Sequence, residues 1–271
     1  MKISALRFLF CAALAAVFAL NASAQTQLGR IKAARVTGEV TKVSPGGQPV
    51  RVDNSTELTE SDVITTGKES SVVLVFENAS TVRIGADSRL EVKQFKIDPL
   101  AEEIDLATAK KEPTKSITEL DLTYGELVGD VKKLNSSSTY SIKTPVGAAG
   151  IRGTQFRIVF RPSSDGKSFT FTLSTAEGLV LFTGSTTGSG APVEVAAEQE
   201  VIVKADVAAD GSLSVTAPAA AQQISTEAQT QIAAAVAQVE AVVQQLIQTG
   251  VLPPPPPVTD KPQLTPGAGG Q

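Results

Sequence analysis

The chain has 271 residues and a formal net charge of −4, from 24 basic and 28 acidic side chains. It lacks the excess of Lys and Arg that neutralises phosphates, so we expect no nucleic-acid partner. Histidine is absent and the single cysteine is Cys11, which excludes histidine-based metal sites and Ser–His or Cys–His nucleophiles. We therefore expect no metal and no cofactor.

Residues 1–24 have the features of a secretory signal peptide. Lys2 gives a positive start, residues 8–20 are a 13-residue apolar run, and small residues precede a cleavage point between Ala24 and Gln25. A retained membrane anchor is the alternative, but this run is shorter than the roughly 20 residues that span a bilayer. We expect a mature chain without a membrane span, exported to the periplasm or the extracellular space.

Residues 30–205 are expected to form a single β-rich domain. Short runs of alternating apolar and polar residues are separated by Gly, Pro, Asn and Asp, which is typical of strands and turns. The clearest hairpin joins residues 156–161 to 168–173 through a turn with Pro162 and Gly166. We predict an all-β fold, namely a roll, solenoid or sandwich. The predicted strands are 34–43, 63–66, 72–76, 81–84, 90–95, 120–124, 127–131, 156–161, 168–173, 179–182, 193–195 and 201–203.

Residues 97–116 interrupt this pattern with charge runs and two prolines. They predict an exposed loop, with room for one helical turn near residues 100–109. Glu102 and Glu103 are candidates for an acid–base pair. Adjacent side chains point to different sides of most backbones, so a solvated loop is the favoured interpretation.

Residues 217–250 change to a helical period. An apolar seam with spacings of four, three, four and three predicts an amphipathic helix that ends at Gly250. The seam residues are Ile232, Val236, Val239, Val243 and Leu246. We favour docking of this helix on the β-domain; self-association or a partner helix is the alternative. Residues 251–271, rich in Pro and Gly, predict a disordered, extended tail.

Residues 144–156, TPVGAAGIRGTQF, carry three glycines at three-residue spacing, which mark turns or close backbone approach. The spacing is not the dinucleotide fingerprint, and a strand follows where that motif needs a helix. Arg152 is expected to be buried and to bond carbonyls of irregular backbone; contact with a ligand or partner is the alternative. The candidate site residues, structural or partner-binding, are Thr144, Pro145, Gly147, Gly150, Arg152, Gly153, Thr154 and Phe156.

This stretch resembles the FecR-type periplasmic domain, for which TPxGxxGIRGTxF is the most specific match. LTESDVITTG at residues 58–67 and SSVVLVFENASTVR at residues 70–83 add to a resemblance that covers residues 31–203. It implies an all-β envelope domain that binds rather than catalyses. In the best-known members this domain lies outside a single membrane span and relays a receptor signal towards a sigma factor. Here we expect a signal peptide where those members have a cytoplasmic segment.

The favoured function is therefore an exported, non-enzymatic domain that binds an envelope protein or a surface polymer. The alternative is a periplasmic signalling component that acts with a separate membrane sensor or sigma-factor system. A hydrolase with two carboxylates is disfavoured, because no acidic pair is marked by its context and aromatic side chains for sugar stacking are few. The pattern defines neither the partner's identity nor the oligomeric state.

Overall fold

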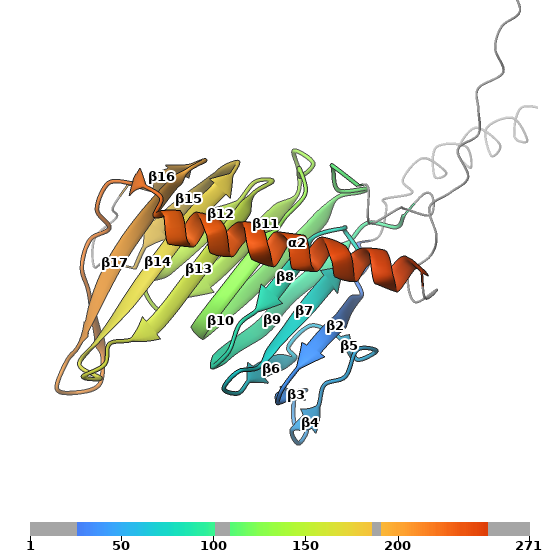
Figure 1. Cartoon of the computed structure of the whole chain (residues 1–271), viewed down its shortest axis with the longest axis horizontal. Helices are drawn as coiled ribbons and strands as arrows, with labels where there is room; N and C mark the ends of the chain where they lie inside the picture. Colours follow the sequence, from blue (N-terminus) through green and yellow to red (C-terminus); the bar gives the residue numbers. More distant parts are fainter. Residues whose placement is uncertain (1–25, 101–108, 186–190, 249–271) are drawn as a thin grey trace, which may run out of the picture.

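A computed structural model describes residues 26–100, 109–185 and 191–248. Two β-sheets face each other, and one helix lies across the outside of one of them (Figure 1). This arrangement confirms the predicted all-β fold with a C-terminal helix. The predicted signal peptide (residues 1–24) and tail (residues 251–271) lie outside the described residues.

The first sheet, sheet A, has the hydrogen-bonded order β4–β3–β6–β9–β10–β11–β12–β15–β16. A short strand, β1, pairs with the end of β9. Neighbours are antiparallel except β10 and β11, which run parallel. The strands are β1 (Gln27–Leu28), β3 (Val40–Val43), β4 (Val50–Arg51), β6 (Val63–Thr66), β9 (Ser88–Ile97), β10 (Ser116–Asp130), β11 (Thr139–Thr144), β12 (Gly147–Ile151), β15 (Leu179–Gly184) and β16 (Val193–Ala196).

The second sheet, sheet B, is antiparallel and has the order β5–β2–β7–β8–β10–β13–β14–β17, with β18 and β19 both paired to β17. The strands are β2 (Ile31–Thr37), β5 (Glu57–Leu58), β7 (Ser71–Phe76), β8 (Thr81–Ile84), β13 (Gln155–Pro162), β14 (Ser168–Glu177), β17 (Gln199–Val207), β18 (Leu213–Val215) and β19 (Gln222–Gln223). The predicted hairpin is confirmed as β13–β14.

Strand β10 belongs to both sheets. Its first part pairs with β9 in sheet A as far as Tyr124, and from Gly125 to Asp130 it pairs with β13 in sheet B. Gly125 has a φ of +113°, and a Cβ there would lie 2.1 Å from the Ser88 hydroxyl oxygen, so glycine is required. The sequence predicted a break at Gly125; the structure shows one strand that changes sheets there.

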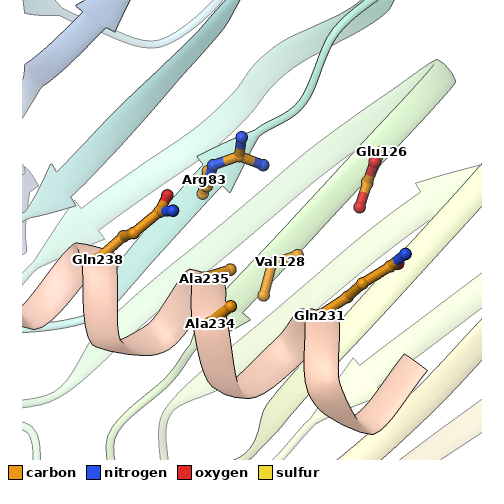
Figure 2. A pocket seen from close by; sticks show the side chains of 7 residues that line it. All are labelled: Arg83, Glu126, Val128, Gln231, Ala234, Ala235 and Gln238. Atoms are coloured by element: carbon orange, nitrogen blue, oxygen red, sulfur yellow. The ribbon is translucent and has the colours of Figure 1, made fainter. Parts of the chain in front are cut away.

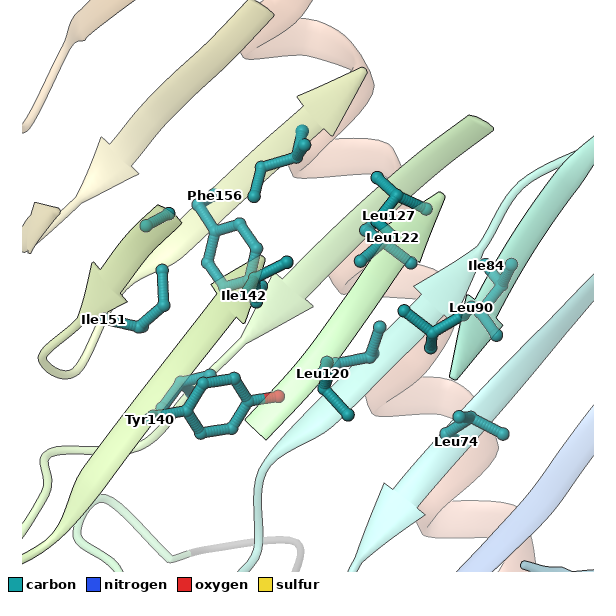
Figure 3. Packing of buried hydrophobic residues seen from close by; sticks show 14 of the residues in the cluster. Leu74, Ile84, Leu90, Leu120, Leu122, Leu127, Tyr140, Ile142, Ile151 and Phe156 are labelled. Carbon is teal, nitrogen blue, oxygen red and sulfur yellow. The ribbon is translucent and has the colours of Figure 1, made fainter. Parts of the chain in front are cut away.

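The inward faces of the two sheets enclose the main hydrophobic core, part of which is shown in Figure 3. The alternation predicted for β13 is confirmed, because Phe156, Ile158 and Phe160 are buried while the intervening side chains point outward. Across the core, the rings of Phe76 on β7 and Phe95 on β9 meet edge to face, with centroids 5.1 Å apart. These contacts hold the two sheets together.

Helix α2 (Thr226–Gln248) crosses the outer face of sheet B (Figure 1). All five predicted seam residues are buried, none more than 8% exposed. The helix packs against Ala34, Val73, Val75 and Val128, which also explains why β7 is apolar on both faces. Docking on the chain's own β-domain, the favoured interpretation, is what the structure shows.

The helix begins at Thr226, later than the predicted residue 217. Ser225 caps it, since its hydroxyl accepts a hydrogen bond from the Ala228 N–H at 3.2 Å. The residues before it are extended, and β19 pairs with β17. The predicted end at Gly250 lies outside the described residues. In the part of the chain that the structure describes, no helix has the length and apolarity to cross a membrane.

The predicted loop over residues 97–116 follows β9 and precedes β10. Its described part contains an isolated bridge between Lys111 and Lys133. Residues 101–108, with Glu102, Glu103 and most of the predicted helical turn, are not among the described residues.

Candidate binding site

The predicted site residues run from the end of β11, through β12, to the start of β13. Thr144 ends β11, and its hydroxyl donates a 2.9 Å hydrogen bond to the Gly147 carbonyl across a turn that contains Pro145. A Cβ on Gly147 would lie 2.4 Å from the Thr183 carbonyl oxygen, so this glycine lets β12 approach β15. At Gly150 the nearest atom would be 3.7 Å away, an ordinary contact. The equal spacing of the glycines therefore does not mean an equal role: Gly147 is needed for close approach of two strands, and Gly150 is not.

The second turn carries the chain from sheet A to sheet B. Gly153 has a φ of +75°, and a Cβ on Gly178 would lie 2.3 Å from its carbonyl oxygen, so two corners pack directly on each other. Thr154 and Val131 exchange backbone hydrogen bonds of 2.9 and 3.0 Å, which fastens the corner to the end of β10. Phe156 then enters the core. Most of the motif therefore has a structural role.

The environment of Arg152 differs from the predicted one. Its side chain is exposed, and it makes no hydrogen bond or ion pair with any residue that the structure describes. The prediction of a buried arginine that bonds backbone carbonyls is wrong, because Arg152 lies at the outside of the corner where its side chain points to solvent. Contact with a partner stays a prediction.

The outer face of sheet A is open to solvent and carries a band of charged side chains. Lys93 pairs with Glu91 at 2.7 Å, and Lys143 pairs with Glu119 at 2.5 Å. Burial between these strands raises the pKa of the Asp121 carboxyl. Exposed ion pairs of this kind contribute little to stability, so these groups can exchange partners on binding.

A cleft of about 190 Å³ lies where α2 meets the uncovered part of sheet B. Sheet residues form its floor and one face of α2 forms its wall (Figure 2). The lining residues are Arg83, Glu126, Val128, Gln231, Ala234, Ala235 and Gln238. No sequence motif marks these residues as a site, because the cleft exists only once α2 has docked.

The buried carboxylates outside this cleft have structural partners. Asp62 accepts hydrogen bonds from Ser44 and Thr59, and Glu112 accepts from Ser116 at 2.8 Å. Among the described residues, no group of three or more acidic side chains is placed to hold a metal ion.

These features define a β-domain of two facing sheets with one helix docked on the outside. Residues 62–181 match the family described as "FecR protein", so the chain carries a FecR domain over this range, which is narrower than the predicted resemblance over residues 31–203. Proteins of this family are typically non-enzymatic and regulatory.

Two crystal structures of a "putative anti-sigma factor" from Parabacteroides distasonis, at 2.50 and 1.65 Å resolution, are similar to this chain. Each shares 10% sequence identity with it, and the TM-scores are 0.40 and 0.39. Each match covers 61% of this chain and 61% of the matched chain. No curated protein sequence matches.

Proposed function

We propose that this chain is an exported, non-enzymatic FecR-type domain of the bacterial cell envelope that binds a protein partner. The FecR domain at residues 62–181 is the observation that carries this proposal. The signal-peptide pattern of residues 1–24 supports export. A surface polymer is the other ligand class to test.

In the part of the chain that the structure describes, two polar surfaces remain accessible to a partner beside the docked helix. Because α2 covers much of the outer face of sheet B, the open face of sheet A and the cleft beside α2 are the accessible polar surfaces. Both present charged groups on rigid strands, which suits recognition of a polar surface.

The test is capture of partners from the native envelope by the tagged mature chain. We expect one specific protein in the eluate. If the outer face of sheet A binds it, reversal of the charges of Lys93 and Lys143 should reduce the amount captured. Recovery of a glycan without protein would favour a polymer ligand. Recovery of neither would contradict the proposal.

A signalling role is the alternative, in which the domain acts with a separately encoded membrane sensor or sigma-factor system. The FecR domain also favours it. A membrane sensor among the captured proteins would support this role.

A further inference from the structure

Arg83 is a half-buried cation that has no partner among the described residues. It lies on β8, with Val73 and Val128 directly opposite it on the two neighbouring strands. Both valines are buried under α2. The aliphatic stem of Arg83 therefore lies beside these valines, and Arg83 is one of the residues that line the cleft.

Two other arginines on the outer face of sheet B have partners. Arg157 donates from Nε to Glu126 at 2.8 Å, and Arg161 donates to the Ala86 carbonyl at 2.7 Å. Glu126 is thus already engaged with Arg157, and it forms no ion pair with Arg83. Of the two charged residues that line the cleft, Glu126 is paired and, among the described residues, Arg83 is not, so an anionic group is the complement that Arg83 lacks.

The helix wall adds polar groups at the same place. Gln231 and Gln238 are seven residues apart, so they lie on one face of α2, and Figure 2 shows both beside the cleft. Gln231 is held by Glu227, to which its amide donates at 3.0 Å. Gln238 has no such bond to a described residue, and its amide is free to donate to a ligand oxygen.

The volume restricts the size of the ligand. At about 190 Å³ the cleft is smaller than the roughly 300–1,000 Å³ of pockets that enclose a whole small molecule. It is suited to a single functional group presented on a larger body. Arg offers paired N–H donors that match the two oxygens of a carboxylate.

The geometry points to a carboxylate-binding site, in which Arg83 and Gln238 hold an Asp or Glu side chain of the protein partner. This inference rests on the proposed function, because it names the chemistry by which that partner is bound. The ion pair forms on a partly desolvated surface, where it is stronger than a fully exposed pair.

The test uses the ¹⁵N-labelled mature chain and two short peptides, acetyl-Gly-Glu-Gly-amide and its neutral Gln counterpart, at low salt. We expect the acidic peptide to shift the Arg83 Nε–H and Gln238 amide signals, and the neutral peptide to bind about tenfold more weakly. Arg83→Gln should weaken binding of the acidic peptide about tenfold, and Gln238→Ala, an exposed change that spares the fold, about threefold. Arg51→Gln, at an exposed arginine on the edge strand β4 of sheet A, should leave it unchanged.

Absence of a shift at Arg83, or equal shifts with both peptides, would overturn the inference. Tighter binding of glucuronate than of the acidic peptide would overturn the assignment to a protein side chain. Envelope capture with Arg83→Gln separates this inference from the proposed function. If the variant captures the same protein as the natural chain, only the carboxylate site is wrong; if the natural chain captures none, the proposed function itself fails.

Discussion

The ring of Phe156 lies against the bare α-carbon of Gly129 on the neighbouring strand of sheet B. A Cβ at position 129 would be 2.4 Å from the Phe156 Cζ atom, closer than packed atoms can approach. This contact lets a large ring of the FecR motif enter the core beside β10.

We expect Gly129→Ala to lower the free energy of unfolding by about 1–3 kcal/mol, because the ring must shift within a packed core. Urea unfolding monitored by circular dichroism measures this loss. Gly150→Ala is the matched control: its Cβ meets nothing closer than 3.7 Å, so stability should change by less than about 0.5 kcal/mol. Equal losses at the two positions would contradict the packing argument.

Tyr140 is 3% exposed, and its hydroxyl has no hydrogen-bond partner among the described residues. Burial raises the pKa of its phenol. Since an unsatisfied buried hydroxyl costs about 1–3 kcal/mol, Tyr140→Phe should raise the free energy of unfolding by about 1 kcal/mol. Thermal unfolding checks this, with Tyr124→Phe on the exposed surface as the neutral control. A destabilised Tyr140→Phe variant would mean that the hydroxyl has a partner.

Asp62 predicts a pH dependence of stability. Burial alone would raise the pKa of its carboxyl, but hydrogen bonds from Ser44 and Thr59, with the charge of Lys42, bring the pKa below its usual value. A lowered pKa in the folded state stabilises the protein above the unfolded pKa of about 4, and this stabilisation is lost as the pH falls through the folded pKa.

We therefore expect Asp62→Asn to be less stable than the natural chain by about 1–3 kcal/mol at pH 7, and the difference to shrink as the pH falls below 4. Urea unfolding at several pH values measures the stability difference at pH 7 and its decrease at lower pH. The exposed Asp206 provides the control, since Asp206→Asn should be nearly neutral at every pH. A difference for Asp62→Asn that stays constant with pH would exclude this account.

The docked helix should unfold together with the sheets. Ile232 is 1% exposed in the contact between α2 and sheet B. Ile232→Ala should therefore lower the free energy of unfolding by about 2–5 kcal/mol. The helix and the sheets should still unfold in one transition, at a lower melting temperature. Gln244→Ala, on the exposed face of the helix, should leave the melting temperature unchanged. A helix that melts separately from the sheets would show that α2 contributes no stability to them.

Local patterns predicted the elements whose structure depends on nearby residues. The alternation of β13 and the seam of α2 follow from which side chains face a core, and both were confirmed. Arg152 was misjudged because its burial depends on which side of a corner faces solvent. The Arg83 cleft could not be predicted, since it forms between α2 and strands more than 100 residues earlier in the sequence, which meet only after folding. The strands β18 and β19 were missed because they are short edge segments defined by pairing with β17.

Because β10 belongs to both sheets, cleavage of the chain next to it affects both sheets. The strands that precede it lie on one side of it and those that follow lie on the other, in both sheets. A protease cut just before Ser116 would therefore uncover an edge in each sheet at once, and neither fragment would be left with a complete set of strand partners. Loss of this one strand should therefore make the chain prone to aggregation.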